Sequence, residues 1–275
     1  MKIIVLILLL GVISSCASVP LPQQRQDTAN QLAASHNWQA KRIQTQQFDL
    51  LSYRPKNITN QSLLTVYLEG DGLAWLYAHT ISTDPTPINP VGFKLALTHP
   101  KGNAVYLARP CQYVGGIAAR SCTKHDWTDN RFSEEVITSI NEALNVLKAE
   151  FNASELHLIG FSGGGAVAAL LAAKRDDVSM LITVAGNIDH QAWTAYHKIS
   201  PLMGSLNPAN FRQQLSKVKQ IHFVGENDTV IPPFLAYDFI AGLPVYSPAK
   251  VIVVPDQTHG CCWESIWPNL YESID

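Results

Sequence analysis

The sequence predicts an α/β protein in which helices cover both faces of a mostly parallel central sheet. Along most of the chain, short and nearly continuous apolar runs alternate with segments that have the pattern of helices. Parallel strands that are connected by helices produce this alternation. The chain has 275 residues, of which 47% are hydrophobic and 15% charged, so it can also fill the large core that such a sheet requires.

The first part of the predicted domain contributes three strands and one helix. Residues 48–53 form one apolar run, and residues 63–69 form a second that is rich in β-branched and aromatic side chains and stops at Gly70-Asp71-Gly72. A short helix is expected over residues 90–98, and a third strand over residues 104–109. We see no internal repeat and no second domain in the chain.

The second part begins with a helix over residues 133–150. Ser133 is a typical N-cap residue, and Glu134 and Glu135 suit the first turn because the helix dipole favours anions there. Strands and helices then alternate to the end of the chain, with strands at 156–160, 180–185, 220–225 and 250–254 and further helices at 210–217, 233–241 and 263–271. We interpret residues 187–210, which are irregular, as a candidate small lid.

The first residues predict export. Lys2 precedes an apolar run over residues 3–13, which is shorter than the ~20 residues that span a bilayer, so we interpret residues 1–15 as a signal peptide. The end of this segment resembles the lipobox of bacterial lipoproteins, which implies that Cys16 is lipidated and anchors the protein in a membrane. Ala17 in the next position implies the outer membrane. An ordinary secreted protein is the alternative.

The region after Cys16 is expected to be a tether. Residues 16–46 are rich in glutamine and show little pattern, so we expect low structure there and place the globular domain at residues 47–275. The formal net charge of −2 includes no polybasic stretch, and nucleic acid is therefore not expected as a partner.

The cysteines are interpreted in this exported context. If Cys16 carries lipid, four cysteines remain, and the sequence does not choose among their three possible pairings: Cys111, Cys122, Cys261 and Cys262. The first two lie in a long loop and would close a small ring, which stabilises a fold by about 3 kcal/mol. The last two are adjacent and would either bond to each other or each bond elsewhere. A zinc site that joins them with His259 matches no standard spacing, so no metal is predicted.

The most informative stretch is Gly160-Phe161-Ser162-Gly163-Gly164. It fits the pattern G-x-S-x-G, in which small residues flank a serine that is exposed in a strained turn between a strand and a helix. An apolar run precedes the stretch and an Ala/Leu-rich segment follows it, as this motif requires. Ser162 is therefore the candidate nucleophile. A glycine-rich turn without catalytic function is the alternative.

A serine needs a base and an acid to become a nucleophile. Asp228 follows the strand at 220–225, and His259 follows the final strand at 250–254. Because the carboxyl ends of parallel strands meet at one edge of a sheet, both side chains are expected near Ser162. Asp189, which follows the strand at 180–185, is the main alternative for the acid, and Glu226 is a weaker one.

These motifs together resemble the α/β-hydrolases. The stretches GFSGGG, GENDTVIP and Thr258-His259-Gly260 resemble the nucleophile, acid and histidine loops of that fold and follow one another in its chain order. The resemblance extends from about Phe48 to the end of the chain. It implies a serine hydrolase that cleaves a small-molecule or lipid ester through an acyl-enzyme, with no cofactor. A peptidase or thioesterase with the same triad, or a binding lipoprotein without turnover, are the alternatives.

The same resemblance implies two donors for the oxyanion. One is the backbone N–H of Gly163, and the other is the N–H of Asp71 or Gly72 in the loop after residues 63–69. Hydrolases of this fold often have His-Gly in that loop, whereas this chain has Glu69-Gly70. A carboxylate at residue 69 would oppose the negative charge unless it is paired or turned away. A simple tight turn is the alternative for this stretch.

Overall fold

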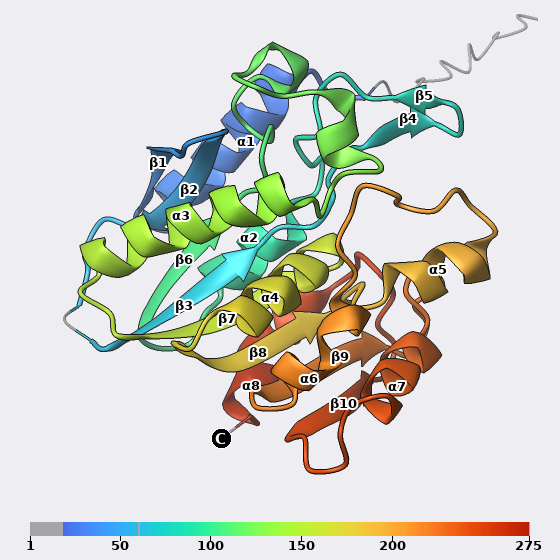
Figure 1. Cartoon of the computed structure of the whole chain (residues 1–275). Coiled ribbons are helices and arrows are strands. Elements are labelled where there is room, and N and C mark those ends of the chain that lie inside the picture. Colours follow the sequence, from blue (N-terminus) through green and yellow to red (C-terminus); the bar gives the residue numbers. More distant parts are fainter. Residues whose placement is uncertain (1–18, 60, 275) are drawn as a thin grey trace, which may run out of the picture.

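The fold is organised around an eight-stranded sheet with the order β1-β2-β6-β3-β7-β8-β9-β10 (Figure 1). The computed structural model describes residues 19–59 and 61–274, so the expected signal peptide over residues 1–15 and Cys16 lie outside the described residues. Six strands run parallel: β6 (Asn103–Leu107), β3 (Leu63–Leu68), β7 (Glu155–Phe161), β8 (Val178–Val184), β9 (Lys219–Gly225) and β10 (Ala249–Val254). β1 (Trp38–Gln44) and β2 (Asp49–Pro55) are antiparallel to their neighbours at one edge. The prediction of a mostly parallel sheet is confirmed.

Helices cover both faces of this sheet (Figure 1). One hydrophobic core lies between the sheet and α3 (Glu134–Glu150), α4 (Gly163–Lys174), α6 (Arg212–Leu215) and α7 (Pro233–Ala241). A second core lies on the opposite face, beneath α1 (Pro22–Ser35), α2 (Val91–Leu97) and α8 (Trp263–Glu272). Burial of apolar side chains on both faces explains why the strands are nearly continuous apolar runs.

The second core is rich in aromatic side chains. Trp263 and Trp267 of α8 are fully buried, and the Nε1 of Trp267 donates to the hydroxyl of Tyr67 at 2.8 Å. Tyr53 stacks on Phe93 of α2 with ring centroids 4.5 Å apart. A buried indole requires a partner for its N–H, and the Tyr67 hydroxyl supplies one. The last helix is thereby fixed against the sheet next to the loop that carries His259.

The segment that the sequence predicts to be an unstructured tether is partly folded. Within residues 16–46, α1 packs Ala29 and Ala33 into the second core, and β1 adds an edge strand to the sheet. The expectation of low structure was wrong for this part. The sequence signal is weak because α1 buries only two alanines and the polar Arg25, and because β1, as an edge strand, buries only Ile43.

The described residues contain further elements that the sequence did not indicate. A short hairpin joins β4 (Trp75–Tyr77) to β5 (Thr80–Ile81), and 3₁₀ turns occur at Gly116–Ala118 and Lys124–Trp127. The candidate lid at residues 187–210 contains α5 (His190–His197) and the start of a 3₁₀ turn at Pro208–Phe211, and the helix expected at 210–217 is divided between that turn and α6. No helix in the described part of the chain is long and apolar enough to cross a bilayer.

The four candidate cysteines pair in sequence order. Cys111 and Cys122 form a disulfide that closes the long loop after β6, with Cα atoms 5.9 Å apart. Cys261 and Cys262 form a disulfide between adjacent residues. One of the three pairings that the sequence left open is therefore realised, and the second disulfide directly precedes α8.

Candidate active site

Ser162 lies at the sharp turn between β7 and α4. Its backbone has φ 51° and ψ −121°, a region that residues other than glycine seldom occupy. Holding a serine there costs about 1–3 kcal/mol, which the surrounding packing must offset. The turn also requires Gly160, because a Cβ at this position would lie 2.2 Å from the carbonyl oxygen of Gly164. The close approach of strand and helix therefore explains why the small residues flank the serine.

Three side chains that are distant in sequence form one chain of hydrogen bonds. The Nε2 of His259 lies 2.9 Å from the Oγ of Ser162, and its Nδ1 lies 2.8 Å from the Oδ2 of Asp228. A carboxylate can only accept, so Nδ1 carries the proton and Nε2 is left to accept from the serine hydroxyl. The imidazole is thus held in the tautomer that can take a proton from Ser162.

Asp228 is itself fixed by the backbone. It is buried, and its Oδ1 accepts the N–H groups of Val230 and Ile231, each at 2.8 Å. These two bonds leave Oδ2 free to face His259. The structure places this acid, which follows β9, within hydrogen-bonding distance of His259.

The loop that carries His259 is held on two sides. The Nε1 of buried Trp263 donates to the carbonyl oxygens of Thr258 and His259, at 3.0 and 3.2 Å. From the opposite side, the Nδ2 of Asn89 donates to the carbonyl of Gly260 at 3.3 Å. The ring of Phe161 packs against the imidazole, with centroids 5.3 Å apart. These contacts fix the height of the imidazole above the sheet.

The other candidate acids have different partners. Asp189 caps α5 by accepting the N–H of Ala192 at 3.2 Å, and its Oδ1 also accepts from the Nδ2 of Asn207 at 2.9 Å. The Oε2 of Glu226 accepts the N–H of Asp256. Of the three acids, Asp228 is the one bonded to His259.

Asp71 enters the site from the loop after β3, with its carboxylate held by two arginines. Arg131 donates to Oδ2 at 2.5 Å and Arg109 donates to Oδ1 at 3.4 Å, and both arginines are buried. Burial raises the pKa of Asp71, but the two guanidinium groups outweigh that effect and hold it below its usual value. Burial in turn lowers the pKa of Arg109 to about 10, which leaves it charged at neutral pH. Asp71 is therefore an ionised carboxylate that is neutralised by cations.

The carboxylate of Asp71 also touches the residue after the nucleophile. A Cβ on Gly163 would lie 2.0 Å from Oδ1 of Asp71, so only glycine fits between the two loops. The N–H of Gly163 belongs to the first turn of α4, where backbone donors have no partner within the helix. The structure thus brings the two candidate oxyanion residues together beside Ser162.

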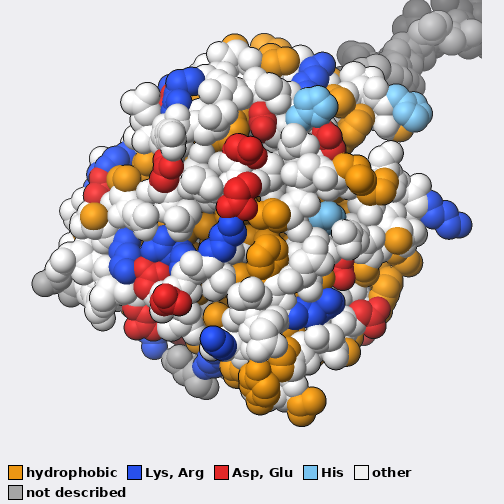
Figure 2. All heavy atoms as spheres, viewed as in Figure 1, with side chains coloured by type: hydrophobic (Ala, Val, Ile, Leu, Met, Phe, Trp, Pro, Cys, Tyr) orange, Lys and Arg blue, Asp and Glu red, His pale blue; other side chains and the backbone are white. Residues whose placement is uncertain are grey.

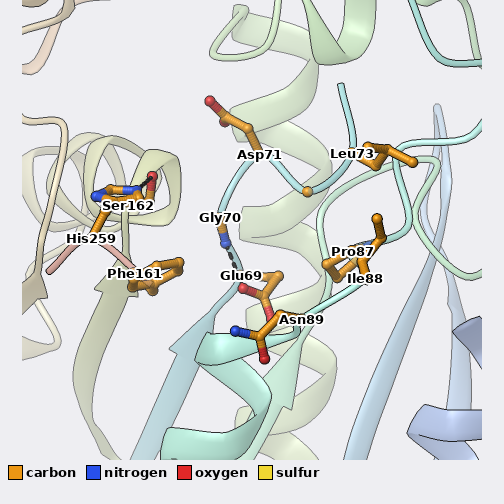
Figure 3. A pocket seen from close by; sticks show the side chains of 11 residues that line it. Glu69, Gly70, Asp71, Leu73, Pro87, Ile88, Asn89, Phe161, Ser162 and His259 are labelled. Atoms are coloured by element: carbon orange, nitrogen blue, oxygen red, sulfur yellow. Dashed lines mark hydrogen bonds between the residues drawn. The ribbon is translucent and has the colours of Figure 1, made fainter. Parts of the chain in front are cut away.

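Glu69 is turned toward the start of α2. Its carboxylate accepts the N–H of Gly70 at 2.9 Å (Figure 3). It also accepts the N–H groups of Gly92 at 3.2 Å and Phe93 at 3.3 Å. Burial raises its pKa, and these backbone donors oppose that shift. Backbone N–H groups at a helix N-terminus stabilise negative charge. The acidic residue that departs from the hydrolase pattern is therefore paired, as the sequence analysis required.

A cavity of about 270 Å³ lies over these groups (Figure 3). One wall is formed by residues from the loops after β3 and β7, and the opposite wall by the segment before α2. The lining residues are Glu69, Gly70, Asp71, Gly72, Leu73, Pro87, Ile88, Asn89, Phe161, Ser162 and His259. We refer to this space as the reaction cavity.

Several residues of the site were not found from the sequence. Asp228 was selected because it is a polar residue just beyond the end of a parallel strand. Arg109 lies just beyond the end of β6, so the same rule also applies to it. Arg131 lies between the Cys111–Cys122 disulfide and α3, outside the ring that the disulfide closes, and no local pattern connects it with Asp71. Asn89 comes from an irregular segment whose path the sequence does not define.

Comparison with known proteins agrees with this fold. Residues 117–252 match the model of a serine hydrolase family, FSH1. Among solved structures, an α/β serine hydrolase homologue from Coxiella burnetii has a TM-score of 0.58 at 18% identity, covering 86% of this chain and 94% of its own. An esterase from Pyrococcus furiosus has a TM-score of 0.61 at 14% identity, with 93% and 91% covered. An acylaminoacyl peptidase from Pyrococcus horikoshii has a TM-score of 0.58 at 13% identity, with 86% and 40% covered.

No curated protein sequence matches the chain. The likeness to the solved structures extends over most of the described domain, and the family match includes both the elbow at Ser162 and the loop of Asp228. Together with the sheet order, these findings identify the chain as a serine hydrolase of the α/β-hydrolase fold.

Proposed function

We propose that the protein is an exported, membrane-anchored esterase that acts through an acyl-enzyme on Ser162. The observation that carries the proposal is the continuous chain of hydrogen bonds from Asp228 through His259 to Ser162. His259 accepts the hydroxyl proton of Ser162 while Oγ attacks the ester carbonyl. Asp228 stays ionised and stabilises the imidazolium that forms.

The oxyanion that develops on the carbonyl needs donors that are already in position. The N–H groups of Gly163 and Asp71 are our candidates, and each donor of this kind lowers the barrier by about 3–4 kcal/mol. The two arginines that hold the Asp71 carboxylate outnumber it in charge. They therefore offset the repulsion that this carboxylate would otherwise exert on the oxyanion.

The second half of the reaction uses the same groups. The protonated His259 gives its proton to the departing alcohol, and the acyl group remains on Ser162. His259 then takes a proton from a water molecule, which attacks the acyl carbonyl. The attack forms a second tetrahedral intermediate. Its breakdown releases the carboxylic acid, and His259 returns the proton to Ser162. No step requires a metal or an organic cofactor.

An ester is proposed because of the proteins that share this fold. The esterase from Pyrococcus furiosus is matched over 91% of its length, whereas the acylaminoacyl peptidase is matched over only 40%. The present chain is thus closer in length to this esterase than to this peptidase. Thioesters and peptides are the substrates to compare with it.

Labelling with a fluorophosphonate tests the nucleophile. The folded protein should be labelled, and the label should be lost in Ser162→Ala and strongly reduced in His259→Ala. Ser154→Ala is a matched control, because Ser154 precedes β7 at the other end of the strand. Folded wild-type protein that is not labelled would refute catalysis by Ser162 and favour a binding protein.

Export and anchoring are supported by the N-terminal sequence and by the disulfide between Cys111 and Cys122, a bond that is typical of oxidising compartments. Radiolabelled palmitate should be incorporated into the wild type and not into Cys16→Ser. Cell fractionation should then place the wild type with the outer membrane. Incorporation that persists in Cys16→Ser would refute the anchor and leave the esterase proposal untouched.

A further inference from the structure

A second and larger cavity opens beside the reaction cavity. Its volume is about 960 Å³, compared with about 270 Å³ over Ser162. Pockets that hold small organic ligands usually enclose about 300–1,000 Å³. The reaction cavity therefore has room for the ester group that reacts but not for the rest of a large substrate. The second cavity has the volume for the remainder of a substrate.

The walls of the second cavity come from three segments, which are the β4–β5 hairpin, residues 124–131 and residues 193–202 of the candidate lid. Two indole rings and several aliphatic side chains supply its apolar lining, and the residues concerned are Trp75, Ala78, Ile81, Trp193, Ile199 and Leu202. The segment at 124–131 contributes polar side chains, among them Lys124 and Thr128. Apolar surface thus faces the cavity from both the hairpin and the lid segment.

The two cavities have a common boundary. Arg131 lines the second cavity and donates to Asp71, which lines the reaction cavity, at 2.5 Å. The loop after β3 also passes from one to the other, since Leu73 lines the first and Trp75 the second. This ion pair and this loop therefore lie at the boundary between the two cavities.

The lid segment is connected to the triad in the same way. The Nε1 of Trp193 donates to the carbonyl of Val230 at 2.8 Å, and the N–H of Val230 donates to Asp228. The far wall of the second cavity is therefore fixed to the loop that holds the candidate acid. A substrate that lies in this cavity would be positioned relative to His259 and Ser162.

Large apolar side chains are exposed next to the lining residues. Tyr77 at the hairpin is 74% exposed, and Met203, which follows Leu202, is 84% exposed. Figure 2 shows apolar side chains at the surface along the edge of the molecule that carries the hairpin and α5, at the right of the view. Exposed apolar patches of this kind mark sites that bind apolar ligands, membranes or other proteins.

We infer that the second cavity binds the hydrocarbon chain of a long-chain acyl ester, so that the enzyme prefers lipid esters to small ones. The inference rests on the ester hydrolysis proposed above and specifies its substrate class. The hydrocarbon chain lies against Trp75, Trp193 and Ile199, while the ester group reaches Ser162 past the pair of Asp71 and Arg131.

A binding assay tests the inference without turnover. The Ser162→Ala protein is titrated with a fatty acid that carries bromine on its chain, because bromine quenches the fluorescence of an indole that it contacts. Quenching should saturate, and most of it should be lost when Trp75→Phe and Trp193→Phe are added. The chain has six tryptophans, and Trp38→Phe is the matched control, since Trp38 packs against Phe93 in the second core. Absent quenching, or quenching that the double variant retains, overturns the inference.

A chain-length series tests the same inference by activity. In the wild type, kcat/KM for p-nitrophenyl esters should rise with acyl length by up to roughly fourfold for each methylene that is buried. Ile199→Trp, which fills the cavity, should lower the ratio of dodecanoyl to acetyl kcat/KM at least tenfold. Val245→Trp places the same ring on a fully exposed site in the loop before β10 and should leave the ratio unchanged.

The outcomes separate the two proposals. A ratio that is equal in Ile199→Trp and the wild type overturns the chain-binding cavity, even if esters are hydrolysed. Saturable quenching by the brominated fatty acid, together with no hydrolysis of any ester, overturns the proposed esterase and supports the cavity as a binding site for the chain.

Discussion

The arginine that holds Asp71 provides the sharpest test of how this site tolerates a carboxylate beside its oxyanion. In Arg131→Met, Asp71 keeps only the contact with Arg109 at 3.4 Å and loses the one at 2.5 Å. Methionine preserves most of the buried volume but not the charge. The Asp71 carboxylate, which packs against Gly163, then lies next to the turn of Ser162 with less compensation of its charge.

The expected loss can be worked from the geometry. Two unit charges a few ångströms apart interact by about 2–4 kcal/mol at an effective dielectric constant of 20. If that repulsion acts on the oxyanion, kcat/KM for an acetyl ester falls roughly 30- to 1,000-fold. A buried ion pair that loses one partner also destabilises the fold by about 3–5 kcal/mol. Arg131→Met should therefore be both slower and less stable.

Kinetics and urea unfolding on a small set of variants check this reasoning. Asp71→Asn combined with Arg131→Met removes both charges and should restore kcat/KM to within about tenfold of the wild type. Arg42→Met is the matched control, because Arg42 forms an exposed ion pair with Asp49 that contributes about 1 kcal/mol or less. A folded Arg131→Met enzyme with unchanged kcat/KM would show that Asp71 exerts no repulsion on the transition state. A double variant no faster than the single one would show the same.

Three further predictions concern the acid, the pH dependence and the disulfide. Asp228→Asn should lower kcat about 10⁴-fold because an amide no longer selects the tautomer of His259, while Asp189→Asn should leave kcat within threefold, both measured with an acetyl ester. The pKa of Asp177 is about 2, because its arginine and lysine partners outweigh the effect of burial. The ion pairs of Asp177 therefore stabilise the fold above about pH 4, the ordinary pKa of an aspartate, and this stabilisation is lost as the pH falls toward 2. The free energies of unfolding of the wild type and Asp177→Asn should thus differ near neutrality and become equal at low pH. Cys122→Ser should lower the free energy of unfolding by about 3 kcal/mol. In a Cys261→Ser/Cys262→Ser background, which lacks the second disulfide, a reducing agent should have the same effect, and it should have none once Cys122→Ser is added.

The fold and the centre of the site could be predicted because both follow from one geometric rule. Parallel strands end at the same edge of a sheet, so polar residues after β7, β9 and β10 must lie close together even though Ser162 and His259 are 97 positions apart. The apolar runs that define those strands are visible in the sequence because the strands are buried on both faces. Three short motifs were thus enough to select the three side chains that the structure joins by hydrogen bonds.

The parts that could not be predicted depend on contacts without a local signal. The helix α1 buries two alanines and Arg25 in a glutamine-rich segment, and such a face is not distinguishable from an unstructured tether. Arg131 reaches Asp71 across 60 positions, from a loop whose path depends on a disulfide and on the burial of Trp127. A loop of that length has no period from which the direction of a side chain can be read.

The stretch Glu69-Gly70-Asp71 places two carboxylates beside an anionic transition state, and the structure compensates them in different ways. Glu69 is held by backbone N–H groups at the start of α2, which no single side-chain substitution can remove. Asp71 is held by two side chains, either of which a substitution can delete. The effect of Asp71 on the reaction should therefore be adjustable through its arginines, whereas that of Glu69 is fixed by the fold. Variants at Arg109 and Arg131 should consequently change the effect of Asp71 on kcat in proportion to the charge that they remove.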